Sequence, residues 1–278
     1  MSVITSLSLS ARVTLDLHSL NNEGTEGNQQ QTRMVHILNQ SGERAVVTAM
    51  SGDMFKHILV GHLVPLLAAT GQPLSPGARI CDADRINAFN EGFVDFCTEE
   101  KEYVVGGQTK KGWAHSESEI MSKMIAECSL TDMAGALVTG KRSVGRKSVV
   151  EFGWVVGLPE KTTTEQYFHV KYAPEGRGGA AGGETVAGKQ AIFHRPASSG
   201  QYALICTLEL SRIGVNDITR KAVVSRVDRE KRARALIHAL ASTLIEPSGA
   251  QRNTQNPHIV ACEGIVAVSS GSLPAPLL

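Results

Sequence analysis

The densest group of cationic side chains lies at residues 140–148, where the sequence Gly-Lys-Arg-Ser-Val-Gly-Arg-Lys-Ser holds four basic residues and no acidic one. Glycines let a backbone approach a ligand closely, and hydroxyl and guanidinium groups donate hydrogen bonds to phosphate oxygens. A segment of this kind is usually only a solvated loop, but this mixture of donors is typical of phosphate contact. The loop is therefore predicted to contact phosphate groups.

A second group of potential phosphate ligands begins at Ser51 and continues through Gly52 and Asp53 to Lys56 and His57. Ser51 is predicted to cap a helix, and the unpaired N–H groups at a helix start attract anions. Asp53 would repel a phosphate, so an ordinary capped helix is the alternative interpretation.

Other motifs do not support catalysis or a cofactor. Residues 183–189 fit the pattern G-x-x-x-x-G-K, but Gln190 follows where a phosphate-binding loop has Ser or Thr. His57 and His62 are five residues apart, so they do not share a helical face as metal ligands do. Since no Ser, Cys or Thr lies in a recognisable nucleophile motif, the sequence predicts no enzymatic activity, no metal and no cofactor.

Composition bounds the class of protein. The 278 residues are 42% hydrophobic, and 28 basic against 27 acidic residues leave a formal charge of +1. This balance argues against a histone-like protein or a polybasic membrane binder, but it allows a local basic groove. Five scattered cysteines without a C-x-x-C pair, and no apolar run of about 18 residues, predict a soluble protein in a reducing cytoplasm.

Alternating apolar residues predict strands, and broader apolar stripes predict helices. From residue 7 to residue 18 the alternation predicts that Leu17 shares the buried face and that His18 lies on the opposite face. Residues 19–28 are predicted to form a loop. The further predicted strands are residues 34–38, 45–49, 148–156, 202–210 and 259–268, and the helices follow Ser51 as far as Gly71 and span residues 226–246.

Two insertions interrupt these elements, at residues 72–145 and 158–200. Without them the order is strand, helix, strand, strand, helix, strand (βαββαβ). This order predicts an α+β protein with a ferredoxin-like or RNA-recognition-motif fold. Loops and insertions that emerge from one compact core are suited to gripping a partner.

Four segments carry a resemblance to a known family: residues 8–24, which include ARVTLDLHSLNNEG, Ser51-Gly52 with Lys56, residues 128–135 (CSLTDMAG) and residues 146–152 (RKSVVEF). Together they resemble the backbone subunit of type I CRISPR surveillance complexes (Cascade), in the DevR-type autoregulator branch of the seventh Cas protein family. The resemblance implies a palm, a helical fingers insertion and a thumb hairpin insertion. The palm would comprise residues 1–71, 146–157 and 201–278, with the fingers at 72–145 and the thumb at 158–200.

The resemblance also implies a function. Copies of the chain would polymerise along a guide RNA (crRNA) within a ribonucleoprotein that contains other Cascade subunits. Each copy would hold the sugar-phosphate backbone and leave the bases free to pair with target DNA. A content of 13 aromatic residues (2 Trp, 4 Tyr and 7 Phe) fits a protein without extensive base-stacking platforms.

Carried over to this sequence, the resemblance implies the following RNA-facing residues: His18, Asn21, Asn22, Ser51, Lys56, His57, Arg142, Arg146 and Lys147. Candidates for a thumb wedge that displaces a nucleotide are Tyr167, Phe168 and His169. One alternative is a target-RNA endonuclease of the type III backbone kind that uses Glu23 or Glu26 with a divalent ion. The other is a transcriptional autoregulator that binds one duplex promoter.

Overall fold

The computed structural model describes residues 4–20, 22–27, 29–39, 41–139, 141–172, 190–248 and 256–276. Its strands are β1 (Ser6–His18), β2 (Asn22–Glu26), β3 (Gln29–Thr32), β4 (Met34–Leu38), β5 (Arg44–Met50), β6 (Glu100–Val105), β7 (Gln108–Trp113), β8 (Ala136–Val138), β9 (Val144–Arg146), β10 (Val150–Phe152), β11 (Val155–Tyr172), β12 (Gln190–Leu208) and β13 (His258–Ser269). Its helices are α1 (Gly52–Ala69), α2 (Pro76–Arg79), α3 (Glu91–Thr98), α4 (Glu117–Glu127), α5 (Ser129–Ala134), a 3-10 turn η1 (Leu210–Arg212) and α6 (Arg226–Ile245). This mixture confirms the predicted α+β class.

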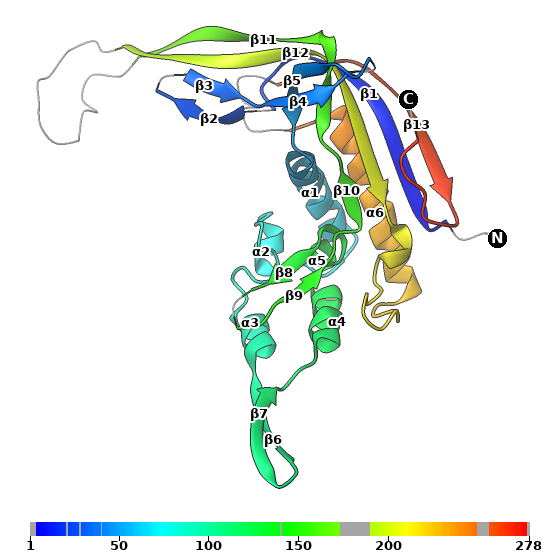
Figure 1. The fold of residues 1–278 in the computed structure, drawn as a ribbon. Coiled ribbons are helices and arrows are strands. Elements are labelled where there is room, and N and C mark those ends of the chain that lie inside the picture. The colour runs from blue at the N-terminus through cyan, green and yellow to red at the C-terminus, as the bar shows by residue number, and fades with distance from the viewer. Residues whose placement is uncertain are drawn as a thin grey trace, which may run out of the picture.

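One curled antiparallel sheet organises the molecule, with strand order β13-β1-β12-β11-β5-β4 and β10 also paired to β12. Helices α1 and α6 lie together on one side of it (Figure 1). Apolar side chains of β1, such as Leu9 and Leu15, form one core with Leu59 of α1 and Leu236 of α6. Burial of such side chains is the main favourable contribution to the fold.

The serine face of β1 is also buried, because the chain beyond β13 crosses it. The hydroxyls of Ser6 and Ser8 donate hydrogen bonds to the carbonyls of Gly271 and Leu273 at 2.6 and 2.7 Å, and Ser10 donates in the same way to the carbonyl of Pro276. Polar side chains of a strand can therefore be buried once each hydroxyl has an acceptor.

A bulge at the end of β1 reverses the predicted faces of two residues. Leu17 has a φ of 52°, and the pairing of β1 with β12 shifts between Leu15 and His18. An extra residue in a strand moves the following side chains to the other face. Leu17 is consequently 47% exposed and His18 is fully buried, which is the opposite of the prediction.

Two other segments differ from their predicted form. Residues 22–26, predicted as part of a loop, instead pair with residues 29–32 as the hairpin β2–β3, and β3 bridges β12 at Gln29. The predicted strand 148–156 is divided into β10 and the start of β11. The division lies at Gly153 and Trp154, and the Trp154 side chain is 49% exposed rather than buried beside Val150.

Residues 72–139 and 141–145 form a lobe at one end of the sheet, built from α2, α3, the β6–β7 hairpin, α4, α5 and most of the β8–β9 hairpin (Figure 1). At the other end, β11 and β12 extend together from the body as a long hairpin. Residues 173–189 of the predicted second insertion lie outside the described residues. Within the described part of the chain, no helix is both long and apolar enough to cross a membrane.

Candidate nucleic-acid interface

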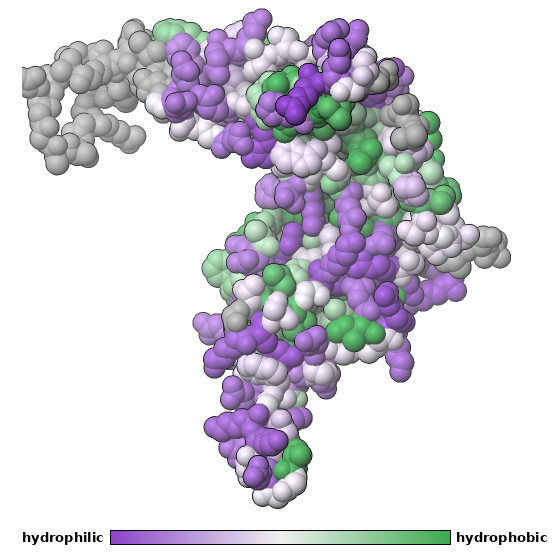
Figure 2. Space-filling view, in the orientation of Figure 1, coloured by the Kyte–Doolittle hydropathy of each residue, from purple (hydrophilic) through white to green (hydrophobic). Residues whose placement is uncertain are grey.

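The molecule is hollowed along one side. The space-filling view shows the hollow (Figure 2), and the ribbon shows the long β11–β12 hairpin with β2–β3 above it, the lobe that carries α2 and α3 below it, and α1 between them (Figure 1). Figure 2 shows hydrophilic side chains along much of this concave side. A concave polar surface between two projecting parts is the shape expected of a site that holds an extended chain.

The start of α1 is fixed closely against β10. The Ser51 hydroxyl caps the helix by accepting a hydrogen bond from Met54 N at 3.2 Å. A Cβ on Gly52 would lie only 2.4 Å from the Phe152 carbonyl oxygen, so this approach requires glycine. Ser51 was predicted to face RNA, and Gly52 was expected to permit close approach of a ligand; in the structure Ser51 caps the helix and Gly52 packs against β10.

Lys56, in the first turns of α1, is half-buried and lies near a second cation, Arg85. Burial and the charge of Arg85 lower the pKa of Lys56, and the charges of Asp53 and Glu151 partly offset this. Burial also lowers the pKa of Arg85. Within the described residues, neither Lys56 nor Arg85 forms an ion pair.

Arg85 was not predicted from the sequence. Its Nη1 donates to the carbonyls of Gly135 at 2.8 Å and Ala83 at 3.2 Å, while its buried Nε has no hydrogen-bond partner. The residue adopts a φ of 47°, in a turn between α2 and α3 that matches no motif. Only the folded chain brings this turn to the start of α1.

Lys147 joins the same neighbourhood through Glu151. Its Nζ lies 2.7 Å from Glu151 Oε1, and its side chain is 68% exposed. Since Glu151 also acts electrostatically on Lys56, Lys56 has both Arg85 and the Lys147–Glu151 pair as neighbours. We refer to the three cations Lys56, Arg85 and Lys147 as the Lys56 cluster. His57 follows Lys56 on α1 and is exposed.

Arg142 lies elsewhere. It belongs to the connection between β8 and β9, where its Nη1 donates to the carbonyl of His115 at 2.7 Å. Its guanidinium stands 5.2 Å from the centre of the Trp113 ring, in a cation–π contact. The contacts of Arg142 therefore attach it to β7 and the start of α4, and none of them links it to the Lys56 cluster.

Arg146 is buried, contrary to the prediction that it faces RNA. Its side chain has no exposed surface, and it lies 2.8 Å from Asp132 and 2.7 Å from Asp217 in ion pairs. It also donates to the carbonyls of Arg212 and Val215 at 2.8 and 2.9 Å. With every donor direction occupied by protein, this guanidinium has no access to a phosphate, and we exclude it from the interface.

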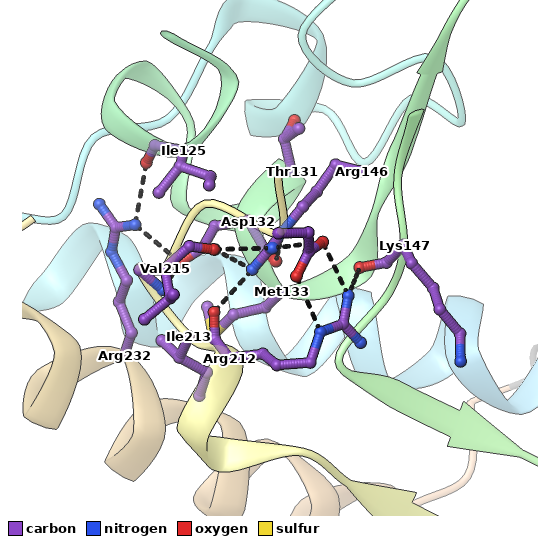
Figure 3. Close-up of polar contacts among 12 residues, drawn as sticks. Ile125, Thr131, Asp132, Met133, Arg146, Lys147, Arg212, Ile213, Val215 and Arg232 are labelled. Atoms are coloured by element: carbon purple, nitrogen blue, oxygen red, sulfur yellow. Dashed lines mark hydrogen bonds and ion pairs between the residues drawn. The ribbon is translucent and has the colours of Figure 1, made fainter. Parts of the chain in front are cut away.

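Asp132 is the centre of this buried network (Figure 3). Besides Arg146, it accepts hydrogen bonds from Arg232 Nη1 and from Gly214 N, both at 2.8 Å. Burial raises the pKa of Asp132, and the two guanidinium groups oppose that change. The network joins α5, β9 and α6, so the resembling segments 128–135 and 146–152 each contribute to the stability of the fold.

His18 is likewise a core residue and not a surface ligand. Its Nε2 lies 2.8 Å from the Tyr202 hydroxyl, and its Nδ1 accepts a hydrogen bond from Leu20 N at 3.3 Å. Burial lowers the pKa of His18 to about 4, so the ring is neutral at neutral pH. Of its two predicted partners, Asn22 begins β2 and Asn21 lies outside the described residues.

The three wedge candidates lie on the outer part of β11. Tyr167 is 41% exposed, and its hydroxyl donates to Glu165 at 3.3 Å. Phe168 points to the other face, where it is 59% exposed and meets the ring of His194 edge-on at 5.7 Å. His169 is half-buried and lies on the same face as Tyr167.

The carboxylates of the predicted endonuclease alternative are exposed and separately engaged. Glu23 accepts from Arg33 Nε at 3.2 Å, and Glu26 accepts from Gln31 Nε2 at 3.3 Å. Among the residues that the structure describes, no three His, Cys, Asp or Glu side chains gather in a way that could hold a metal ion.

Comparison with known proteins places this geometry in a family. A search of curated proteins gave no match. Among solved structures, the chain is similar to one in a pre-nicking CRISPR RNA-guided surveillance complex, with a TM-score of 0.49, 13% identity and coverage of 93% of this chain and 77% of that one. It is also similar to the crystal structure of Thermofilum pendens Csc2, with a TM-score of 0.42, 13% identity and coverage of 96% and 67%. A chain of another CRISPR RNA-guided surveillance complex gives a TM-score of 0.41, 11% identity and coverage of 91% and 66%. The model of the family described as CRISPR-associated negative auto-regulator DevR/Csa2 matches residues 9–277, which confirms the predicted resemblance: the chain belongs to the DevR/Csa2 family.

Proposed function

We propose that this protein is a non-catalytic guide-RNA-binding subunit of a type I CRISPR surveillance complex. The Lys56 cluster carries the proposal, because two of its three cations, Lys56 and Arg85, form no ion pair within the described residues and lie near the start of a long helix. An anion that binds between Lys56 and Arg85 lowers the free energy of the protein, because it relieves the repulsion between the two cations. A phosphodiester is such an anion.

The pKa of Lys56 shows the direction of this effect. Desolvation and repulsion by Arg85 lower the pKa of Lys56, which means that the fold disfavours the charged form of this side chain. A phosphate at this place would reverse the repulsion and accept hydrogen bonds from the N–H groups at the start of α1. Backbone phosphates are common to every guide sequence, so binding of this kind does not read sequence.

The arrangement of strands supports the palm that the family resemblance implies. In chain order β1, α1, β10, β12, α6 and β13 form a βαββαβ unit, and its strands lie in the order β13-β1-β12-β10. We assign residues 1–71, 146–157 and 201–278 to the palm, 72–145 to the fingers and 158–200 to the thumb. Among the wedge candidates we favour Phe168, because an exposed apolar ring with one aromatic neighbour can enter a base stack.

In the proposed assembly, copies of the chain line up along one guide and contact other subunits of the complex. The guide bases then remain available for pairing with target DNA. Two carboxylates that are exposed and bonded to other side chains, Glu23 and Glu26, support a binding role rather than metal-dependent cleavage.

The test uses the full-length chain and two fluorescent single-stranded RNAs of unrelated sequence. Lys56→Gln should weaken the affinity for both RNAs by roughly 10- to 100-fold, since a hydrogen bond to a charged group contributes about 1.5–3 kcal/mol. Lys110→Gln, on the exposed β7 strand away from the concave side, provides a control of equal charge. Equal losses in the two variants, or a wild-type affinity that differs strongly between the two RNAs, would contradict the proposal.

A cleavage assay distinguishes the endonuclease alternative from the proposed binding function. The wild-type protein, incubated with Mg²⁺ and an RNA complementary to the guide, should leave that RNA intact. Cutting at regular intervals that Glu23→Ala or Glu26→Ala abolishes would establish the alternative.

A further inference from the structure

A second basic surface lies away from the concave side. It consists of the turn at residues 218–222, after η1, and of the exposed face of the first half of α6, and we call it the α6 surface. Its exposed cations are Arg220, Lys221, Arg226, Lys231 and Arg234. In Figure 1 this region lies at the lower right of the body, whereas α2 and β8 lie on its left side.

The charge of the α6 surface is poorly compensated. Arg226 pairs with Glu230 at 2.9 Å, but within the described residues the other four cations form no ion pair. Of the two nearby aspartates, Asp217 pairs with Arg212 and Arg146, whereas Asp228 accepts from Ser225 and Gln72 and interacts electrostatically with Lys231 without pairing with it. Four cations without an ion pair in the described part of the chain, Arg220, Lys221, Lys231 and Arg234, therefore face solvent on this surface.

The turn that carries Arg220 and Lys221 is held rigidly. Asn216 is 1% exposed, and its Oδ1 accepts from Ile218 N and Thr219 N at 2.9 and 3.1 Å. Its Nδ2 donates to Ser118 O and Ser122 Oγ, each at 2.8 Å, which ties the turn to α4. The cations are thus presented from a fixed backbone, which reduces the ordering cost when a ligand binds.

The first half of α6 adds a straight row to this turn. Val227, Lys231 and Arg234 follow the i, i+4, i+7 spacing of one helical face, and all three are exposed. The row spans about 10 Å, because a helix rises about 1.5 Å per residue. The two cations of this row, Lys231 and Arg234, are about 4.5 Å apart along the helix axis, close to the roughly 3.4 Å by which successive phosphates of one duplex strand advance along its axis.

We propose that the α6 surface binds double-stranded DNA through its phosphates, without reading sequence. Residues 213–248 contain no Phe, Tyr or Trp, so the surface has no ring on which an unpaired base could stack. A protein partner is disfavoured because lysine is depleted and aromatic residues are enriched in protein interfaces. A duplex needs only cations and a rigid, exposed row, and it would stand apart from a guide held on the concave side.

The experiment measures binding of the full-length chain to a fluorescent 30-base-pair DNA duplex and to a single-stranded RNA. The test variant is Lys221→Ala, Lys231→Ala and Arg234→Ala combined. Arg220, which has a φ of 59°, is retained so that the backbone of the turn is left unchanged. The control variant is Lys101→Ala, Lys110→Ala and Lys111→Ala combined on the β6–β7 hairpin. Both triple variants change the formal charge from +1 to −2, as three positive charges are removed.

The test variant should lose at least tenfold in duplex affinity and keep its RNA affinity. Its plot of log affinity against log salt concentration should be shallower by about 2 to 3, at roughly 0.9 per lost phosphate contact. The control variant should bind the duplex nearly as the wild type does. Thermal melting of both variants confirms that they fold.

Several results would overturn the proposal. Equal losses of duplex affinity in the two triple variants would show that only the net charge matters. Undetectable binding of the wild-type protein to the duplex would refute the proposal directly. Loss of RNA binding in the test variant alone would assign the α6 surface to the guide. Competition by polyglutamate as strong as by DNA, at equal charge concentration, would favour an acidic protein partner. Failure of Lys56→Gln to weaken RNA binding would bear only on the proposed guide function.

Discussion

Removal of the charge at Asp132 should cost a large part of the stability of the fold. The carboxylate is fully buried and accepts from Arg146, Arg232 and Gly214 N, each at 2.8 Å. Asp132→Asn keeps the volume but leaves the buried Arg232 without an ion-paired carboxylate and Arg146 with Asp217 alone. Removal of one partner of a buried ion pair costs about 3–5 kcal/mol, and we expect a loss in this range. This loss approaches the whole stability of a marginal domain, which is about 5–15 kcal/mol.

Chemical denaturation monitored by circular dichroism and tryptophan fluorescence measures the effect. Glu127→Gln is the matched control, because Glu127 pairs with Lys123 on the surface and should contribute less than about 0.5 kcal/mol. The double variant Asp132→Asn with Arg232→Met should lose less than the sum of the single losses, since the second change removes one uncompensated charge. A loss below about 1 kcal/mol for Asp132→Asn, or strict additivity in the double variant, would refute the reasoning.

Three further predictions concern the core and the start of α1. Burial lowers the pKa of His18 from 6.5 to about 4, so between these values the unfolded chain binds a proton that the folded chain does not. Stability should therefore fall as the pH is lowered through this window, by up to about 3 kcal/mol, and His18→Gln should flatten a denaturation series from pH 7 to pH 4. Gly52→Ala should destabilise the fold by at least about 2 kcal/mol in denaturant, because its Cβ would lie 2.4 Å from the backbone oxygen of Phe152; a neutral effect would show that α1 can shift. Ser51→Ala should cost about 1 kcal/mol through loss of the helix cap, whereas Ser51→Asp should restore it.

Periodicity predicted the elements well where one local pattern decides the outcome. The helix after Ser51, the helix that ends near Glu246 and the strands around Leu9 and Val266 are present near the predicted bounds, whereas the strand around Leu204 begins at Gln190 instead of residue 202. The signal fails at single residues that the local pattern does not control. A bulge at Leu17 exchanges the faces of Leu17 and His18, and the period-two rule contains no information about where a bulge occurs.

The candidate site was predictable only in part, because charge in a sequence does not reveal burial. Lys56 and Lys147, both predicted to face RNA, lie near one carboxylate, Glu151, which the sequence did not predict as their neighbour. Arg146 and Arg232 look like surface cations in the sequence, but Asp132 compensates both inside the fold. Arg85 came from a turn without a motif, and its position depends on contacts with residues about 50 positions away.

The strand order of the sheet also determines how late in translation β1 can complete its pairing. β1 is flanked by β12 and β13, so this strand pairs with two strands that are made much later in the chain. Helix α6, which packs over the same core, emerges only after β12. A nascent chain that has not reached residue 258 cannot pair β1 along both of its edges. An unpaired strand edge of this kind exposes the growing polypeptide to chaperones and to aggregation until β13 is made.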